Sequence, residues 1–265
     1  MSKIASAFDH GKAFIAFITC GDPDLETTGK AVRAAVENGA DLIELGIPFS
    51  DPTAEGPVIQ EASLRALQGG VTTDLIFDFV TELRKSVTVP MVFMTYANVI
   101  FSYGAERFIS TCEKRGIDGL ILPDLPYEEK EEFLPLCRQH GVDLISLIAP
   151  TSENRIAMIA REAEGFIYLV SSLGVTGTRS EITTDLKPII RTIRENAKVP
   201  VAVGFGISKP EQAKAMAALS DGAIVGSAIE KILAQYGREA PAHIGSYVRA
   251  MKDALKELNG EETEA

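Results

Sequence analysis

Short apolar runs alternate with longer amphipathic segments along almost the whole chain, and this pattern restricts the fold more than any other feature. Eight runs rich in β-branched residues have the length and composition of buried strands. They are Ala13–Cys20, Asp41–Leu45, Met91–Thr95, Gly119–Leu122, Asp143–Ala149, Phe166–Val170, Val201–Gly204 and Ala223–Val225. Seven segments between them have helical periodicity: Leu25–Asn38, Thr73–Ser86, Glu106–Arg115, Glu128–Gln139, Glu153–Glu162, Leu186–Asn196 and Pro210–Leu219. A further helix is expected over Ser246–Leu258.

Strict alternation of strands and helices predicts parallel strands joined by helical crossovers. Eight such units in 265 residues match a single (β/α)8 TIM barrel, an α/β fold. The alternative, a doubly wound open sheet, normally uses fewer strands and a glycine-rich nucleotide turn after its first strand. We therefore expect one domain over residues 1–265, with a short acidic tail at about 259–265. Turns that leave helices, such as 38–41, 115–118 and 140–143, carry a glycine suited to left-handed backbone.

Charge and composition exclude several classes of partner. The net charge of −11 argues against nucleic acids and anionic membranes. The three cysteines lack metal-type spacing and are expected to be reduced thiols of a cytoplasmic protein. The three histidines are scattered, so we expect no metal site. The first residues lack a secretory core, and no apolar run approaches the length of a membrane span.

One acidic residue, Glu44, interrupts the second predicted strand. Because strand side chains alternate between faces, Leu42, Glu44 and Gly46 share one face while Ile43 and Leu45 lie on the other. Burying an unpaired carboxylate is costly, so a chain seldom places one there without a use. A structural role would require a buried Lys or Arg partner, and no basic residue lies on a neighbouring strand run. The pattern favours a functional carboxyl.

A second carboxylate, Glu55, lies in the loop that follows this strand. The loops after strand two (47–61) and strand six (171–184) are the long ones. In a TIM barrel the loops at the carboxyl ends of the strands build the active site. Glu44 and Glu55 are therefore expected close together, although a solvated loop acid remains the alternative for Glu55.

Two glycine turns near the C-terminus have the character of an anion site. Residues 204–211 follow strand seven, and Ser208 with Glu211 fits a capping box for the next helix. Residues 226–229 leave strand eight at the start of a short helix. Free N–H groups and the helix dipole can bind phosphate without a cationic side chain. Gly177, in the glycine-rich loop after strand six, could add one more amide to this site.

These segments together resemble one known family. They are Glu44–Pro52, Gly56–Pro57, Tyr96–Asn98, Pro123–Pro126, Gly174–Gly177, Gly204–Ile207 and Gly226–Ile229. The combination is similar to the tryptophan synthase alpha chain family, from about Phe17 to the final helix. The phosphate turns are shared with other phosphate-binding barrels, whereas Glu44–Pro52 and the loop after strand six are specific to that family.

The resemblance implies a lyase of tryptophan biosynthesis that cleaves indole-3-glycerol phosphate to indole and glyceraldehyde 3-phosphate. This retro-aldol reaction needs no cofactor in the chain itself. Glu44 matches the catalytic glutamate, which would protonate indole C3 and then remove the hydroxyl proton. Glu55 stands where the family usually has aspartate, and it would accept from the indole N–H. Tyr168 matches an active-site tyrosine near the glutamate.

The resemblance also assigns binding residues. The indole pocket would be lined by Phe17, Met94, Ile148 and Phe205, and the phosphate held by Gly177, Gly206, Gly226 and Ser227. Thr176 matches a loop residue expected to reach Glu55. Pro48, Asp51, Asn98 and Asp124 match positions of loop closure and of contact with the family's partner, a beta chain that carries pyridoxal phosphate in an alpha2-beta2 complex. The isolated chain would then be a slow catalyst, because loop closure depends on the partner.

Two other functions remain open at this point. A phosphate-sugar isomerase or synthase of similar fold is one, but a ring-closing synthase would want a lysine near a strand end, and the carboxyl ends of the predicted strands offer none. The other is a non-catalytic barrel that binds the phosphate ligand and only activates its partner. The altered second carboxylate, Glu55, favours that reading.

Overall fold

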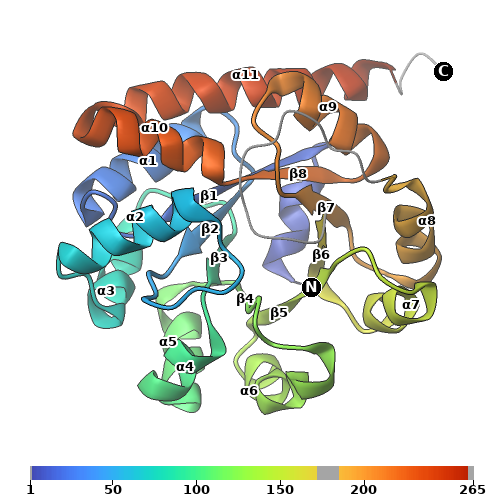
Figure 1. The fold of residues 1–265 in the computed structure, drawn as a ribbon, viewed down its shortest axis with the longest axis horizontal. Coiled ribbons are helices and arrows are strands. Elements are labelled where there is room, and N and C mark those ends of the chain that lie inside the picture. Colours follow the sequence, from blue (N-terminus) through green and yellow to red (C-terminus); the bar gives the residue numbers. More distant parts are fainter. Residues whose placement is uncertain (1, 172–184, 262–265) are drawn as a thin grey trace.

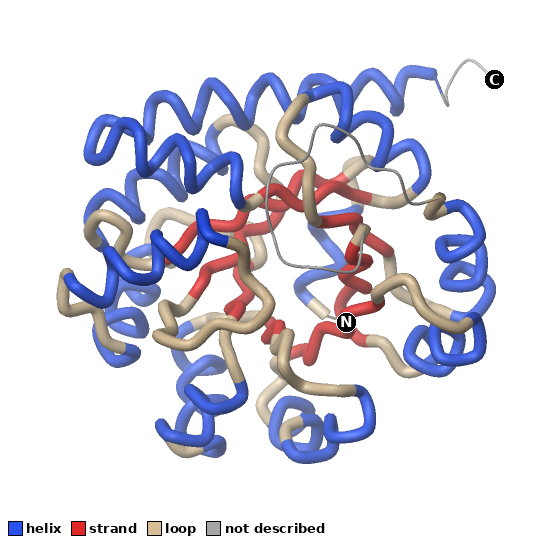
Figure 2. The backbone as a smooth tube through the Cα atoms, viewed as in Figure 1, coloured by secondary structure: helices blue, strands red, loops and turns tan. Residues whose placement is uncertain are grey.

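The eight predicted strands form one closed parallel barrel. The computed structural model describes residues 2–171 and 185–261, with side chains described up to 258 in the last helix. Strand order around the barrel follows the sequence, and β8 pairs with β1 to close it (Figures 1 and 2). The strands are β1 (Ala13–Thr19), β2 (Leu42–Gly46), β3 (Met91–Met94), β4 (Gly119–Ile121), β5 (Asp143–Ile148), β6 (Glu164–Val170), β7 (Val201–Gly204) and β8 (Gly222–Val225). The TIM-barrel prediction is confirmed.

Helices surround the ring of strands, which Figure 2 shows in red. They are α1 (Leu25–Glu37), α2 (Pro57–Gln68), α3 (Thr73–Leu83), α4 (Ala97–Tyr103), α5 (Ala105–Arg115), α6 (Leu134–Gln139), α7 (Glu153–Arg161), α8 (Lys187–Asn196), α9 (Pro210–Leu219), α10 (Ser227–Tyr236) and α11 (Ala240–Glu261). The described residues also form three 3-10 helices: η1 (Lys3–Phe8), η2 (Tyr127–Glu132) and η3 (Gly237–Glu239). The predicted helix 128–139 is thus divided between η2 and α6, while α2, α4 and η1 lie in segments where no helix was predicted.

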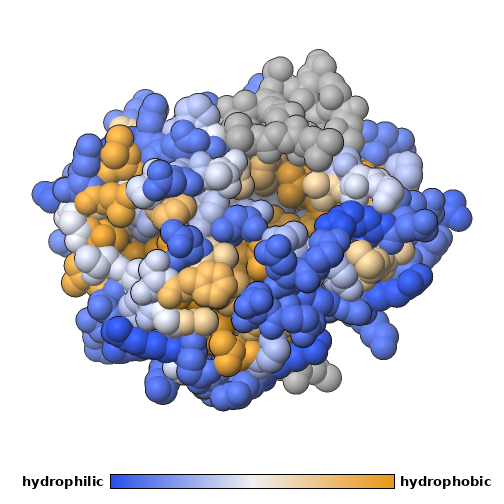
Figure 3. Space-filling model, turned by 60° about the horizontal axis from the view of Figure 1, so that its bottom comes forward, coloured by the Kyte–Doolittle hydropathy of each residue, from blue (hydrophilic) through white to orange (hydrophobic). Residues whose placement is uncertain are grey.

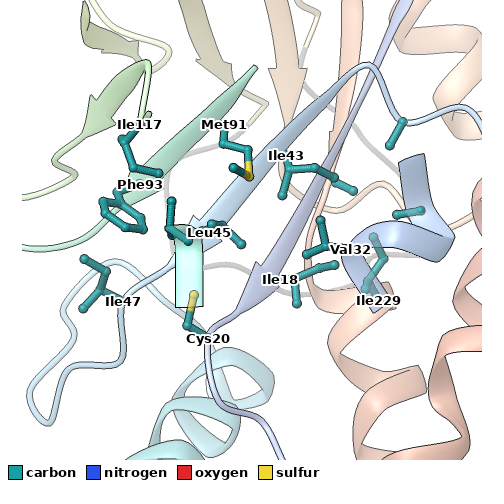
Figure 4. Close-up of a cluster of buried hydrophobic side chains, with 14 of the residues drawn as sticks. Ile18, Cys20, Val32, Ile43, Leu45, Ile47, Met91, Phe93, Ile117 and Ile229 are labelled. Carbon is teal, nitrogen blue, oxygen red and sulfur yellow. The ribbon is translucent and has the colours of Figure 1, made fainter. Parts of the chain in front are cut away.

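Alternation along the strands divides the core into two layers. On β2, Ile43 and Leu45 point outward and pack under the helices, and Ile47 continues this face just beyond the strand (Figure 4). Leu42 packs inside the barrel with Ile15 of β1 and Val92 of β3. Each fully buried aliphatic side chain contributes roughly 1.5–3 kcal/mol through removal from water. The same alternation sends Glu44 to the inside.

The amino end of the barrel is closed by the first helix. Ile4 and Ala7 of η1 are buried with the inward-facing residues, and the ring of Phe8 lies 6.0 Å from that of Phe166 on β6. An added methyl at Gly119, the first residue of β4, would lie 2.9 Å from Ile4 Cδ1, so this plug fits tightly. The interior is therefore filled from this end, which leaves the carboxyl ends of the strands for a site.

The last helix is longer than predicted. α11 begins at Ala240 and runs to Glu261, beside α1 and α9 (Figure 1). It therefore covers residues 259–261 of the predicted tail, because no glycine or proline lies between Ser246 and Asn259 to end the helix. No helix within the described ranges is long and apolar enough to cross a membrane. On the face drawn in Figure 3, apolar side chains lie in separate patches among polar ones.

Candidate active site

Glu44 lies inside the barrel, where only 1% of its surface is exposed. It pairs in register with Phe17 of β1 and Val92 of β3, so apolar residues flank it on both sides. Neither carboxyl oxygen has a hydrogen-bond partner among the described residues. Burial, followed by the nearby charge of Glu55, raises the pKa of Glu44 to about 8. A carboxyl with this pKa is mostly protonated at neutral pH and can still release its proton.

Glu55 is also buried, at 6% exposure, and precedes α2. Its Oε2 accepts a hydrogen bond from the hydroxyl of Tyr96, which follows β3. That hydroxyl in turn accepts from the backbone N–H groups of Thr53 (3.0 Å) and Ala54 (2.9 Å). Burial raises the pKa of Glu55, while the Tyr96 hydrogen bond acts in the opposite direction. The loop after β2 is thus fixed onto the end of β3, with its carboxyl beside Glu44.

Aromatic side chains form one wall of the site. Tyr168 of β6 is 6% exposed, and the edge of its ring meets the ring of Phe205 at 6.3 Å and 82°. Gly204 makes room for this tyrosine, because a Cβ there would lie 2.5 Å from the Tyr168 hydroxyl. Burial, the largest effect, raises the pKa of the Tyr168 hydroxyl well above its usual value. The charges of Glu44 and Glu55 raise this pKa further. Tyr168 is therefore a neutral donor close to both acids.

A single narrow cavity joins most of the predicted site residues. It contains about 420 Å³ of space, the part open to solvent included. Its lining consists of Phe17, Glu44, Ile59, Met94, Tyr168, Phe205, Gly206, Ile207, Ile224, Gly226 and Ser227. One end is acidic and aromatic, and the other consists of the two glycine turns. This arrangement fits a flat apolar ring at one end of a ligand and an anion at the other.

The turn after β7 has an unusual backbone. Phe205 has a φ of 78° and Gly206 a φ of 80°, so two successive residues are left-handed. For a non-glycine residue this costs of the order of 1–3 kcal/mol, and such strain concentrates at functional sites. The hydroxyl of Ser171 donates to the Phe205 carbonyl at 2.8 Å and helps to hold the turn. Turns of this kind can present successive backbone N–H groups to an anion.

The helix beyond the first turn has a different cap from the predicted one. The side chain of Gln212, and not that of Glu211, accepts from the N–H groups of Ser208 (2.9 Å) and Lys209 (3.1 Å) at the start of α9. The helix begins one residue later than the predicted capping box because Pro210 occupies its first position. Gly226 precedes α10, whose first residue is Ser227, as predicted for the second turn.

Some predicted residues lie elsewhere. Ile148 does not line the cavity but packs with Ile156 and Ile159 of α7 in the layer between barrel and helices. The reason is strand alternation, which turns Leu147 inward and Ile148 outward on β5. Thr176 and Gly177 lie outside the described residues. Cys20 is buried at the end of β1, and burial raises the pKa of its thiol, which leaves it an unreactive thiol.

The expected closure and contact residues gather on the loops at the carboxyl ends. Asp124 accepts from the N–H of Ala97 with both oxygens, at 3.0 and 3.1 Å, at the start of α4. Asn98 and Asp51 are exposed, whereas Pro48 is buried. Phe49 stacks on Tyr96 with 5.0 Å between ring centroids, and so the loop after β2 and the loop after β3 form one surface.

Sequence reasoning missed four residues of the site. Tyr96 belongs to a quoted segment, but its bond to Glu55 spans 41 residues. Ile224 shares the inward face of β8 with Gly222 and could have been found by alternation. Ile59 was hidden because α2 was taken for part of a loop, and Ile207 lies in the turn after β7. Within the described residues, no group of three or more metal-ligating side chains could hold an ion.

Comparison with known proteins agrees with this geometry. The model of the family described as "Tryptophan synthase alpha chain" matches residues 5–258. The chain belongs to the tryptophan synthase alpha chain family. A member from Lacticaseibacillus casei is 48% identical over 262 residues, which cover 98% of each chain.

Solved structures of the tryptophan synthase alpha family have the same fold. The alpha subunit from Legionella pneumophila is 34% identical, with a TM-score of 0.86 over 97% of this chain and 99% of that one. A chain of the tryptophan synthase a2b2 complex from Pyrococcus furiosus is 37% identical, with a TM-score of 0.84 over 92% of this chain and 99% of that one. The resemblance first seen in the motifs therefore extends over nearly the whole fold.

Proposed function

We propose that this chain cleaves indole-3-glycerol phosphate into indole and glyceraldehyde 3-phosphate. Membership of the tryptophan synthase alpha family supports this carbon–carbon lyase activity. The observation that carries the proposal is the position of Glu44, a buried carboxyl without a partner among the described residues, in the same cavity as the turns at Gly206 and Gly226. A single ligand with an aromatic ring and a phosphate would span this cavity.

Glu44 would act first as an acid and then as a base. Indole becomes a leaving group only when its C3 carbon gains a proton, and a carboxyl with a pKa of about 8 holds that proton at neutral pH. Once it has given the proton away, the same carboxylate can remove the proton of the glycerol hydroxyl. The C–C bond then breaks, and its electron pair returns to the ring as indole leaves.

Glu55 would accept a hydrogen bond from the indole N–H and stabilise the positive charge that develops on the protonated ring. Its bond from Tyr96 occupies Oε2 and favours the charged form against the effect of burial. Tyr168 lines the cavity beside both acids and would position the substrate between Glu44 and Phe205. Phe17 and Met94 would pack against the ring, whereas Ile148 is not proposed for this role.

The phosphate would bind at the opposite end. Gly206, Gly226 and Ser227 line the cavity there, and α10 begins at Ser227 with its free N–H groups. Each of these donors is backbone or hydroxyl, which suits an acidic chain with a net charge of −11.

The proposed reaction consists of proton transfers and the cleavage of one C–C bond, and it uses no cofactor in this chain. We also propose that the chain works in an alpha2-beta2 complex with a beta chain, in which pyridoxal phosphate would belong to the beta chain. Support comes from the likeness to a chain of the P. furiosus complex. The exposed residues Asn98 and Asp124, on loops at the carboxyl ends of the strands, and the loop that carries Asp51 would face that partner.

Release of indole tests the proposal. Wild type should release indole from indole-3-glycerol phosphate, and more rapidly with a beta chain present. The variant Glu44→Gln keeps shape and burial but cannot donate a proton to carbon, so release should fall by about 10³-fold or more while ligand affinity changes little. Glu239→Gln, at an exposed acid on η3, is the matched control. If wild type binds the ligand but releases no indole even with the beta chain, the non-catalytic alternative is correct.

A further inference from the structure

Another buried carboxyl lies at the start of α10, the helix that follows the turn at Gly226. Glu230 belongs to the first turn of α10 and has no exposed surface. Its backbone N–H donates to the carbonyl of Gly226 at 3.1 Å. Its side-chain Oε1 accepts from the N–H of Thr19, at the end of β1, at 2.6 Å. Glu230 therefore ties the glycine of the proposed phosphate site to the neighbouring strand.

The position of Thr19 explains why this bond is needed. Strand β8 pairs with β1 only as far as Val225, which lies opposite Ala16. Beyond that point the chain leaves the sheet to form the turn at Gly226, so the N–H of Thr19 has no strand partner on this side. Glu230 replaces the missing carbonyl. A buried N–H left without an acceptor would cost roughly as much as a lost hydrogen bond.

No cation is paired with Glu230 in the described part of the chain. Its Oε2 has no hydrogen-bond partner in the described part of the chain, and no ion pair involves it there. The guanidinium of Arg65 on α2 acts on it electrostatically, but Arg65 is bound to Asp22 through two hydrogen bonds of 2.8 and 2.7 Å. Asp22 itself is buried and repels a negative charge on Glu230.

The other groups around Glu230 do not change this balance. The elements packed against α10 are α2, β1, η3 and α11. Besides Arg65 and Asp22, titratable side chains on or next to these elements include Glu61 of α2, Cys20 after β1, Arg238 and Glu239 of η3, and His243 of α11. Burial raises the pKa of Cys20, which stays neutral. Arg238 pairs with Asp24 at 2.9 Å, and His243 stacks on Tyr236 at the far end of α10. Burial, the largest effect, and the charge of Asp22 raise the pKa of Glu230 to about 8, against the hydrogen bond from Thr19 and the charge of Arg65, which act in the opposite direction.

We propose that Glu230 is a positioning residue of the phosphate site that works as a neutral acid, so that its ionisation weakens phosphate binding at the start of α10. This inference rests on the proposed function, because it assumes a phosphate at Gly226 and Ser227. An ionised Glu230 in the first turn would repel a phosphate dianion held at the same helix terminus. Because Glu230 has no exposed surface, water screens this repulsion poorly. By linkage, phosphate binding and proton retention at Glu230 favour each other.

The test measures the pH dependence of binding of sn-glycerol 3-phosphate by titration calorimetry. Glu44 also titrates near pH 8, so the measurement uses Glu44→Gln as its reference protein. Between pH 7 and pH 9 the ligand stays a dianion, because the second pKa of a phosphate monoester is about 6. For the reference protein, Kd should rise about fivefold over this range, as expected if Glu230 loses a proton that bound phosphate retains. For Glu44→Gln/Glu230→Gln, Kd should change by less than about twofold.

Two further measurements complete the design. Glu44→Gln/Glu239→Gln removes an exposed acid at the other end of α10 and should follow the reference protein. Calorimetry in buffers of different ionisation enthalpy should detect proton uptake on binding at pH 8 by the reference protein. This readout needs no Glu230 variant and remains decisive if the double variant does not fold.

Several results would overturn the inference. Weaker binding of the Glu230 variant by the same factor at every pH would indicate a purely structural role. Equal pH dependence in the reference and the Glu230 variant, or no proton uptake at pH 8, would contradict it as well. In these cases the ligand still binds and the proposed function stands. Failure of sn-glycerol 3-phosphate to bind the reference protein even at pH 7 would instead contradict the phosphate site, and this inference with it.

Discussion

The hydroxyl of Tyr96 donates a hydrogen bond to Oε2 of Glu55, across 41 residues of sequence. The same oxygen of Tyr96 accepts from the N–H groups of Thr53 and Ala54, so one side chain holds both the acid and the loop that carries it. Glu55 follows β2 and Tyr96 follows β3, and the parallel pairing of these two strands brings them together. The geometry of the second carboxyl therefore depends on a residue that need not touch the substrate.

Tyr96→Phe tests this dependence. Loss of the hydroxyl removes a donor from a buried carboxyl and an acceptor from two backbone N–H groups, and should lower the free energy of unfolding by about 1–3 kcal/mol. The value of kcat/KM should fall about tenfold, because Glu55 loses its fixed orientation. Tyr103→Phe is the matched control, since its hydroxyl donates to an exposed Asp74. Its effect should stay within about 0.5 kcal/mol. Equal effects of the two variants would contradict the role of Tyr96.

The pH dependence of the rate follows from Glu44. Its raised pKa keeps it protonated at pH 7, and the acid form is lost as pH rises through about 8. Indole release should therefore decline above that pH by about tenfold per pH unit. The profile should also be measured with Glu230→Gln, because Glu230 has a pKa of about 8. The decline in kcat should persist in this variant. A rate that is constant up to pH 10 would contradict Glu44 as the acid.

Much of this site was predictable from local pattern. The inward direction of Glu44 required only strand alternation, and the eight apolar runs located every strand. The helix α2 was missed because its sequence follows a loop rich in Pro and Gly, and its start at Pro57 reads as a turn. Ile148 was assigned to the pocket by resemblance, against the alternation that turns it outward. The bonds of Tyr96 and Glu230 join residues far apart in sequence, and no local pattern encodes such contacts.

The backbone of the phosphate turn can be tested with a matched pair of glycines. Gly206 has a φ of 80° in the site, and Gly141 has a φ of 62° in the turn before β5, with open space around it. Replacement of either by alanine should cost of the order of 1–2 kcal/mol in stability, because left-handed backbone disfavours a Cβ. Gly206→Ala alone should also raise KM for indole-3-glycerol phosphate, by about tenfold or more. If Gly141→Ala raises KM as much, the turn at Gly206 does not bind the phosphate.

Stability should depend on pH through Glu44 and Glu230. In the folded chain the pKa values of Glu44 and Glu230 are about 8, whereas the ordinary pKa of a glutamate is 4.5. Because both are raised, each contributes stability in full below 4.5 that is lost as pH rises toward 8. The loss is about 1.4 kcal/mol per pH unit for each group.

Urea unfolding of wild type and Glu230→Gln between pH 5 and pH 9 measures this effect. The variant should lose stability less steeply up to pH 8, and the two curves should run parallel above it. Glu239→Gln, which removes an exposed acid, should keep the wild-type slope. A Glu230→Gln slope equal to that of wild type would show that Glu230 is ionised in the folded chain at neutral pH.

The proton of Glu44 at neutral pH can be observed directly. The infrared carbonyl band of a protonated carboxyl, taken as the difference between wild type and Glu44→Gln, reports on Glu44 and separates it from Glu230. We expect a band that is present at pH 6 and disappears with a midpoint near 8, the raised pKa of Glu44. A band already absent at pH 6 would mean that Glu44 is ionised inside the barrel and does not act as the acid.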